Sequence, residues 1–328
     1  MKNTSDAQFD QYNYELLPFC AIIGPTASGK TELALALAEE TGADILCVDA
    51  IQVYRRLDVG SAKPTSQERS RIRHFGLDLA SPLENFSASR FAQYAEPILQ
   101  LALKEKRRLI LCGGTGLYYR ALLEGFFEAP DPDPDLRGSL QRRLQAEGLP
   151  ALYAELRRLD PAAAASIHPR DARRALRALE IIRQTGQTVS RLRQGQQIKP
   201  WLALTRFLGV LRERDELARR IEKRTQWMYH NGLIEETLFL MELGCSPRLT
   251  VMQALGYKEC YQYLKGKISL PEAMVSTASG TRRYSKRQMT WFRRQCPSQW
   301  ISWENRKDLQ EIVRQSLQIW LNSDNYRG

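Results

Sequence analysis

The strongest chemical signal in this sequence is a phosphate-binding motif near its start. Residues 24–31 read GPTASGKT and fit the pattern GxxxxGK[ST]. In such a loop the backbone N–H groups surround phosphate oxygens, and the start of the following helix adds positive partial charge. Lys30 is expected to neutralise non-bridging oxygens, and the Thr31 hydroxyl to ligate Mg²⁺. The residues predicted to bind a diphosphate or triphosphate are Gly24, Pro25, Thr26, Ala27, Ser28, Gly29, Lys30 and Thr31.

Two polar residues elsewhere are candidates for the reaction itself, because a phosphate-binding loop fits kinases, ATPases and transferases that release diphosphate. Asp49 follows the apolar run 44–48 and is predicted as a general base, as a group that orients a metal's ligands, or as a helix N-cap. Thr115 follows the run 108–112 within CGGTG. The Thr115 hydroxyl is predicted to donate to a phosphate or to hold a substrate amine; alternatively, the segment forms only a tight turn between a strand and a helix.

The elements around these residues predict an α/β fold. Short apolar runs alternate with helical segments, which is typical of a parallel sheet covered by helices on both faces. Because the carboxyl ends of neighbouring parallel strands meet at one edge, Asp49 is expected to lie beside the phosphate-binding loop. The predicted strands are residues 17–23, 44–48, 108–112 and 202–211, and the predicted helices around them are 31–40, 90–106 and 117–123.

The middle of the chain differs from the rest. The run of alternating Pro and Asp at 129–135 predicts a rigid link, and the residues after it show only helical patterns, at 136–145, 152–159 and 171–184. Residues 131–200 carry a net charge of about +5. We therefore expect a P-loop NTPase-like core made of residues 1–130 and 195–328, interrupted by an all-helical, RNA-binding insertion at 131–194. The predicted C-terminal helices are 212–230, 233–243, 252–264, 271–295 and 307–321.

Composition and charge narrow the class of protein. The 328 residues are 43% hydrophobic and 26% charged, which excludes a mostly disordered or collagen-like chain. The net charge of +11 suggests a polyanionic partner. No apolar run reaches the roughly 18 residues of a membrane span, and the first 20 residues lack the order of a secretory signal. Six cysteines without a CxxC pair argue against zinc or disulfides, so we expect a cytoplasmic protein, and without a coiled-coil seam a monomer.

Several segments together resemble the bacterial tRNA dimethylallyltransferase family, also called IPP transferases. They are GPTASGKT, VDAIQVYRRLDVGSAKP, GGTGLYYRALLEG, HPRDARRALRALE, ALGYKE and RRYSKRQMTWFRR, and the resemblance covers about residues 20–300. It implies transfer of a dimethylallyl group from dimethylallyl diphosphate to N6 of the adenine just 3′ of the anticodon, in tRNAs that read codons beginning with U. Diphosphate is the other product, and the tRNA anticodon stem-loop is the partner.

The resemblance also implies roles for single residues. Asp49 would accept the proton from adenine N6, Thr115 would contact the target nucleotide and the reacting centre, and Arg214 would stabilise the departing diphosphate. The residues that match tRNA-contacting segments of the family are Asp49, Ala50, Ile51, Gln52, Thr115, Arg137, Arg173, Arg174, Ala175, Leu176, Arg177, Gln253, Ala254, Leu255, Gly256, Tyr257 and Lys258.

This chain departs from the family pattern at two places. Many members have Ser after the catalytic Asp where this chain has Ala50, so one hydroxyl contact to the extruded nucleotide is expected to be missing. Eukaryotic relatives carry a C-terminal zinc finger, and this sequence has none, so it resembles the bacterial form.

The segment 272–304 is predicted to be a basic RNA-binding surface. No acidic residue lies between Glu272 and Glu304, and Arg283, Arg287 and Arg294 fall on one face of a helix. Arg283 and Arg287 are accordingly predicted to bind tRNA. The neighbouring aromatic residues are expected to belong to the core rather than to stack on bases; they are Tyr284, Trp291 and Phe292.

Two other functions compete with prenyl transfer. A P-loop kinase of a small metabolite or nucleotide explains the phosphate-binding loop and an acidic base, but leaves the basic helical insertion unexplained. An RNA-binding protein with a regulatory nucleotide pocket explains the charge, and predicts normal tRNA binding and no lost chemistry after Asp49→Ala.

Overall fold

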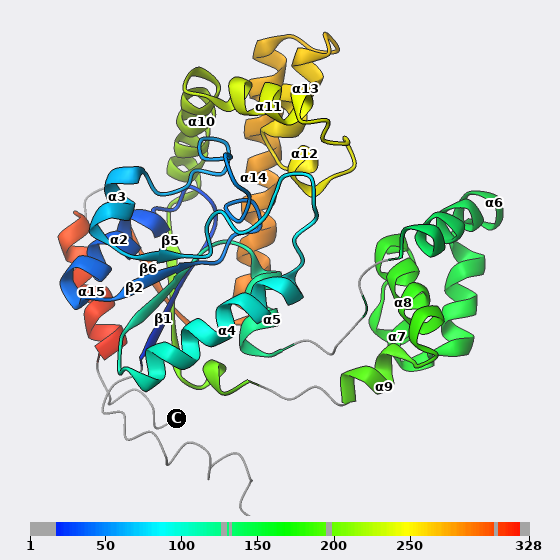
Figure 1. Ribbon diagram of the computed structural model, residues 1–328. Helices are drawn as coiled ribbons and strands as arrows, with labels where there is room; N and C mark the ends of the chain where they lie inside the picture. Colours follow the sequence, from blue (N-terminus) through cyan, green and yellow to red (C-terminus); the bar gives the residue numbers. More distant parts are fainter. Residues whose placement is uncertain (1–17, 126–129, 131–132, 195–198, 305–307, 322–328) are drawn as a thin grey trace, which may run out of the picture. The chain divides into compact units, whose positions relative to one another are not determined.

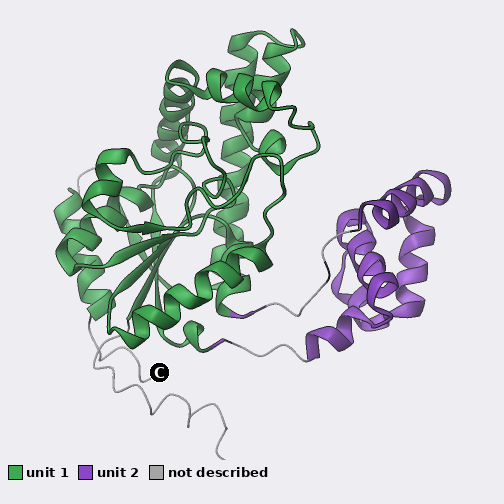
Figure 2. Cartoon of the chain, viewed as in Figure 1, with its two compact units in different colours: residues 1–123, 200–328 green, residues 124–199 purple. Residues whose placement is uncertain are grey.

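The computed structural model describes residues 18–125, 130, 133–194, 199–304 and 308–321. The chain forms two compact units (Figure 2). Unit 1 comprises Met1–Leu123 and Pro200–Gly328, and unit 2 comprises Glu124–Lys199. Residues 129, 131 and 132 of the predicted proline-rich link lie outside the described residues.

Unit 1 is built on a parallel sheet of six strands in the order β3-β2-β4-β1-β5-β6. This confirms the predicted α/β class and four of the strands. The central strands are continuous apolar runs because helices cover both of their faces. The strands are β1 (Phe19–Ile23), β2 (Asp44–Cys47), β3 (His74–Phe75), β4 (Leu109–Cys112), β5 (Thr205–Leu211) and β6 (Ser298–Ser302).

Helices pack on each face of this sheet (Figure 1). On one face, Ile22 packs in a buried cluster with Leu33 of α2 (Lys30–Thr41) and Trp320 of α15 (Leu309–Leu321). On the other lie α4 (Ala88–Lys104) and α5 (Gly116–Leu123), and the Tyr119 hydroxyl donates to the Leu111 carbonyl at 2.8 Å. The short helix α3 (Ser66–Arg71) precedes β3. The sheet is thereby held between two helical layers.

The second half of unit 1 is helical and packs around one long helix. The 3₁₀ turn η1 (Pro200–Leu202) leads into β5, and α10 (Arg214–His230), α11 (Leu233–Glu242), α12 (Thr250–Gln253), α13 (Tyr257–Leu264) and α14 (Leu270–Gln295) follow. The prediction of a single helix over 252–264 is wrong. Ala254 is extended and Gly256 has a positive φ of 95°, which ends α12 and starts α13.

Unit 2 contains only helices among its described residues: α6 (Pro134–Leu159), α7 (Pro161–Ser166), α8 (Ala172–Thr185) and α9 (Val189–Gln194). Gly148, with φ of 78°, kinks α6, so its two halves lie in different directions. Leu140, Leu152 and Leu179 share a small buried core. Asp160 caps α7 through the Ala163 amide and also accepts from the Ser190 amide, which ties α7 to α9.

In the described part of the chain, no helix combines the length and the apolar character that crossing a lipid bilayer requires.

Candidate active site

The phosphate-binding loop connects the carboxyl end of β1 to the start of α2, in the setting that the motif requires. Two glycines allow its path. Gly24 has φ of 144°, and an added Cβ would lie 2.7 Å from the Val210 carbonyl oxygen. Gly29 has φ of 99°, and a Cβ there would meet the Trp303 ring at 2.8 Å. A side chain at either position would displace the loop.

Three arginines hold this loop from one side. Nε of Arg212 donates to the Ser28 carbonyl at 3.1 Å, and Nε of Arg220 donates to the Ala27 carbonyl at 2.9 Å. A terminal nitrogen of Arg224 lies 3.3 Å from the Thr26 hydroxyl. Arg220 and Arg224 are one helical turn apart on α10, so both face the loop. The loop therefore has guanidinium groups on its carbonyl side, which stabilise its shape and add positive potential for an anion.

Lys30 is one of the residues that line the pocket bordered by this loop. Its ammonium donates to the Pro25 carbonyl at 2.7 Å. Burial lowers the pKa of Lys30 to about 8; the charge of Arg224 adds to this shift and that of Asp49 opposes it. A negatively charged ligand beside the ammonium would relieve this unfavourable burial, so the pocket favours an anion.

Asp49 follows β2 and lines the same pocket as Lys30 and Arg224. One of its carboxylate oxygens accepts from the amides of Ile51 at 2.9 Å and Gln52 at 3.3 Å, as in the N-capping interpretation, although no α-helix starts there. These two hydrogen bonds fix the orientation of the carboxylate. Because Asp49 also lines the pocket, its position is compatible with the predicted role as a general base. The sheet edge therefore brings the acidic group and the phosphate-binding loop together, as predicted.

Thr115 holds the segment next to Asp49. Its hydroxyl accepts from the Ala50 amide at 3.0 Å, and its own amide donates to the Val48 carbonyl at 3.3 Å. Gly113 lies so close to Val48 that a Cβ would be 2.1 Å from the Val48 carbonyl oxygen. The turn after β4 thus packs directly on the end of β2, as in the tight-turn interpretation, and Gly113 and Gly114 of this turn line the pocket, whereas Thr115 is not among the lining residues.

The loop after Asp49 is anchored at its far side by a carboxylate. Glu236 of α11 accepts from the amides of Asp58, Val59 and Gly60 at 2.7, 2.7 and 2.9 Å. The Tyr257 hydroxyl also donates to Glu236, at 2.6 Å. Four hydrogen bonds to one carboxylate fix this loop against α11 and α13.

Arg214 does not lie where its assigned role requires. It is the first residue of α10 and is exposed, whereas Arg224 lines the pocket beside Asp49 and Lys30. Burial lowers the pKa of Arg224, and the charge of Asp49 opposes that shift. Arg224, rather than Arg214, is therefore the arginine of α10 that lies where a diphosphate-stabilising group is expected. The sequence feature that could have indicated Arg224 is its spacing of four residues from Arg220, because this spacing places both side chains on one face of α10.

Sequence reasoning also missed four other polar residues that line the pocket: Ser61, His74, Tyr284 and Gln288. Tyr284 and Gln288 both lie on α14, whose aromatic residues were expected to serve the core. Phe292 is fully buried, in line with that expectation. Burial raises the pKa of Tyr284 to about 12, and the charge of Asp49 adds to the shift. The Tyr284 hydroxyl is therefore protonated at neutral pH.

The pocket fits the ligand preferences of Mg²⁺. Thr31 and Asp49, whose side chains carry oxygen ligands, are among its lining residues, and among the described residues no cluster of three or more His, Cys, Asp or Glu side chains forms a metal site. Mg²⁺ commonly binds one or two protein oxygens, substrate phosphates and waters rather than a complete protein cage. This donor set therefore fits Mg²⁺ together with a diphosphate and does not fit zinc.

The residues predicted to bind tRNA fall into two groups. In unit 1, Gln52 lines the pocket and Ala50 and Ile51 adjoin it, whereas Gly256 and Tyr257 are buried, so the Tyr257 hydroxyl serves Glu236. Ala254 and Leu255 are partly buried. The exposed members of unit 1 are Gln253, Lys258, Arg283 and Arg287.

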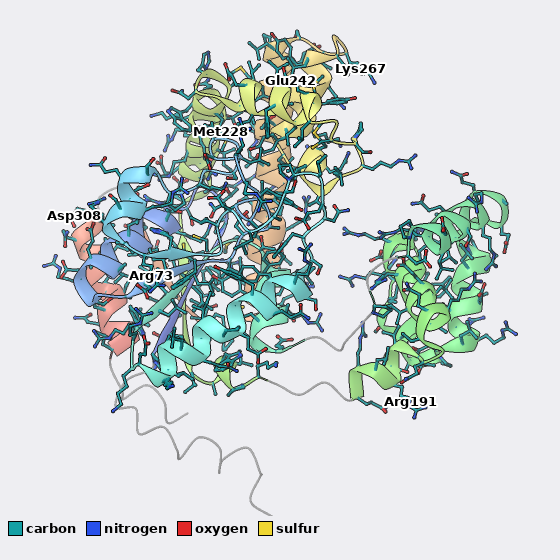
Figure 3. All side chains as sticks on the ribbon, in the orientation of Figure 1. Arg73, Arg191, Met228, Glu242, Lys267 and Asp308 are labelled. Carbon is teal, nitrogen blue, oxygen red and sulfur yellow. The ribbon has the colours of Figure 1, made fainter. Side chains whose placement is uncertain are left out.

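In unit 2, basic side chains lie on the outer surface, Arg191 among them (Figure 3). Arg137, Arg173 and Arg174 are exposed, whereas Ala175 is fully buried and Leu176 is partly so. Arg177 points inward: it bonds to buried Glu180 at 2.9 Å and to the Pro130 carbonyl at 2.6 Å. Arg177 and Ala175 therefore serve the packing of unit 2, and the exposed arginines are its better candidates for an RNA surface.

Comparison with known proteins identifies relatives along most of the chain. A sequence model described as IPP transferase matches residues 52–295. A tRNA dimethylallyltransferase of Geobacter metallireducens is 41% identical over 287 residues, which cover 87% of this chain and 92% of the relative. One of Pelotomaculum thermopropionicum is 40% identical over 299 residues, covering 91% and 95%.

Solved structures of proteins described as transferases that act on tRNA also resemble this chain. The crystal structure of a full-length tRNA isopentenylpyrophosphate transferase from Bacillus halodurans has a TM-score of 0.66 and 36% identity, and the match covers 91% of this chain and 94% of that one. A eukaryotic dimethylallyltransferase acting on tRNA has a TM-score of 0.73 and 25% identity, covering 87% and 73%.

Proposed function

This chain belongs to the IPP transferase family, and we propose that it transfers a dimethylallyl group from dimethylallyl diphosphate to N6 of the adenine that follows the anticodon in tRNA. The observation that carries the proposal is the pocket at the carboxyl edge of the sheet, which is lined jointly by Lys30, Arg224 and Asp49. Cations for a leaving diphosphate and a carboxylate for a proton are the two groups that this transfer needs.

Stabilising the leaving group is the larger task. As the bond between the allylic carbon and the diphosphate oxygen breaks, the electron pair and its negative charge pass to the diphosphate. The loop amides, Lys30 and Arg224 are the groups in the pocket that offset this charge. The arginines on the outer side of the loop keep those amides in place before the substrate arrives, so little reorganisation is needed.

The acceptor needs a base. The lone pair of the adenine N6 amine is delocalised into the ring, so N6 becomes a useful nucleophile only if a proton leaves as the new C–N bond forms. Asp49 is the carboxylate that lines the pocket, and its backbone hydrogen bonds hold one oxygen so that the other is available for the proton. The target base must first leave its stack, at a cost of a few kcal/mol.

We further propose Mg²⁺ as the cofactor. The Thr31 hydroxyl would hold the ion together with oxygens of the diphosphate, and the bound ion would neutralise part of the diphosphate charge. This protein's own contribution is the fixed position of Thr31 at the start of α2, next to Lys30.

Binding of tRNA is assigned to the exposed basic residues of both units. Arg283 and Arg287 share an exposed face of α14, and Arg137, Arg173 and Arg174 are exposed on unit 2. Arginines at such positions bind phosphates and make affinity depend on salt. In this proposal the anticodon stem-loop is the part of the tRNA that they bind, and the protein acts as a monomer in the cytoplasm.

The direct test combines the protein with dimethylallyl diphosphate, Mg²⁺ and unmodified tRNA, followed by digestion and mass spectrometry of the nucleosides. We expect one adenosine per tRNA to gain the mass of a dimethylallyl group in place of hydrogen, with release of diphosphate. A parallel reaction with ATP labelled in the γ-phosphate and small acceptors tests the kinase alternative. Transfer of label without any modified adenosine would overturn the proposal in favour of a kinase.

A further inference from the structure

Gln288 connects two loops of the pocket that are far apart in sequence. It lies on the buried face of α14, and 6% of its surface is exposed. Its carboxamide oxygen accepts from the Thr26 amide at 2.8 Å, and its carboxamide nitrogen donates to the Gly114 carbonyl at 2.9 Å. Because one partner is a donor and the other an acceptor, a single orientation of the carboxamide satisfies both.

The two partners of Gln288 belong to the two halves of the proposed chemistry. Thr26 lies in the phosphate-binding loop. Gly114 precedes Thr115, whose hydroxyl binds the Ala50 amide next to Asp49. Hydrogen bonds and the peptide bond between Gly114 and Thr115 therefore connect the phosphate-binding loop, through Gln288, to the segment that carries Asp49.

Neighbouring groups pack closely around the Gln288 side chain and restrict it to few rotamers. A Cβ on Gly114 would lie 2.2 Å from the Gln288 nitrogen. The Thr26 amide, already bonded to Gln288, is withheld from a phosphate, so the anion must be bound by the amides further along the loop. A buried neutral group with both a donor and an acceptor is required here, and among the uncharged side chains of this length glutamine provides both.

We propose that Gln288 is a positioning residue that sets the separation between the phosphate-binding loop and the segment that carries Asp49. The inference rests on the proposed function, because it is the transfer between a bound diphosphate and a nearby base that makes this separation matter. Displacement of reacting groups by about 1 Å can cost on the order of 100-fold in rate. Gln288 acts on the reacting groups only indirectly, through its hydrogen bonds to Thr26 and Gly114.

Two variants of nearly equal size separate its contributions. Gln288→Met removes both hydrogen bonds and leaves the Thr26 amide and the Gly114 carbonyl unpaired. Gln288→Glu keeps an acceptor for Thr26, loses the donor to Gly114, and places a negative charge beside the anion pocket. The matched control is Gln295→Met, an exposed glutamine at the end of the same helix. The readouts are kcat, the KM for dimethylallyl diphosphate, the Kd for tRNA, the Kd for inorganic diphosphate by calorimetry, and Tm.

For Gln288→Met we expect kcat to fall roughly 10- to 100-fold while the Kd for tRNA stays within about twofold. For Gln288→Glu we expect inorganic diphosphate to bind at least about tenfold more weakly than to the wild type, because like charges repel across the pocket. Gln295→Met should match the wild type in every readout. A structural role alone would instead lower Tm and affect tRNA and diphosphate binding equally.

Wild-type kcat and KM in Gln288→Met, or unchanged diphosphate affinity in Gln288→Glu, would overturn the proposal. So would failure of both variants to fold, since Gln288 would then be a purely structural residue. Failure of the proposed function is distinguishable, because it appears as absence of transfer by the wild type. The diphosphate measurements test Gln288 in either case.

Discussion

A group of arginines around the pocket in unit 1 and a pair on α8 in unit 2 differ in what their side chains contact. In unit 1, Arg212 and Arg220 donate to carbonyls of the phosphate-binding loop, and Arg224 lines the pocket behind it. In unit 2, Arg173 and Arg174 are exposed. The arginines of the first group bond to the protein itself and fix the shape of the pocket before a ligand binds. Those of the second group lie at the surface, where their charge can attract a polyanion such as tRNA. Substitutions in the first group should therefore change turnover, and those in the second should change tRNA affinity.

The largest expected effect belongs to the pocket. Asp49→Asn should lower kcat by about 10²- to 10⁴-fold, because the amide cannot accept the N6 proton. The Kd for tRNA should stay within about twofold, since the Asn oxygen can still accept from the Ile51 and Gln52 amides. Single-turnover rates and filter binding measure the two quantities separately. A variant with wild-type turnover would eliminate Asp49 as the base and break the division between pocket and surface.

Arg224→Ala sharpens the same division. Loss of one group that stabilises the leaving charge should cost about 10²- to 10³-fold in kcat/KM for dimethylallyl diphosphate. Arg214→Ala is the matched control: it lies ten residues earlier at the exposed start of α10, and its activity should remain within about twofold of the wild type. If kcat/KM fell equally in both variants, Arg214 would again be a candidate for stabilising the diphosphate. That result would also indicate that exposed arginines affect turnover.

The pH dependence of diphosphate binding tests the charge of Lys30, which is partly buried. Because the pKa of Lys30 in the free protein is lowered to about 8, Lys30 loses its proton as the pH rises through that value. Binding of an anion favours the protonated form, so the affinity for inorganic diphosphate should fall up to about tenfold per pH unit above it. Lys30→Arg stays charged over this range and should lose this part of the dependence. The ionisation of diphosphate itself is common to both proteins, so calorimetric curves of parallel shape would contradict the prediction.

The smallest effects are expected in unit 2, where two arginines of one helix differ. Arg173→Ala should weaken tRNA binding a few-fold and lower the salt slope of log K by about 1. Arg177→Ala should leave that slope nearly unchanged and instead lower Tm, because it leaves buried Glu180 without its partner. Binding titrations at several salt concentrations, with thermal melts, distinguish the two. A lower slope for Arg177→Ala would show that this arginine also binds RNA.

The fold was predictable where burial is complete. Strands β1 and β4 are apolar along their whole length, and α2 begins at a motif with its own chemistry, so their positions follow from the sequence. Strand β3 has only two residues, and β6 has exposed and partly exposed positions along most of its length. Both lie at sheet edges, where one neighbour is missing and the apolar signal is weak.

The site was predictable only in part, for a geometric reason. Asp49 and Lys30 come directly after strands, so the sheet edge places them. Arg224 lies on a helix in a segment that contains many arginines, and only the rotation of α10 relative to the loop decides which of them enters the pocket. Gln288 carries no charge and lies 262 residues from its partner Thr26. Nothing local in the sequence indicates a contact of that range.

The central place of β1 limits how this protein can be shortened. This strand pairs with β4 on one side and β5 on the other. A fragment trimmed to residues 52–295, which match the family model, would lose β1, β2 and β6 together, leaving β4 and β5 without the strand that joins them. We expect such a truncated chain to aggregate when expressed, because the open edges of β4 and β5 would pair with other chains. Useful boundaries for producing the enzyme therefore begin before Phe19 and extend past Trp320.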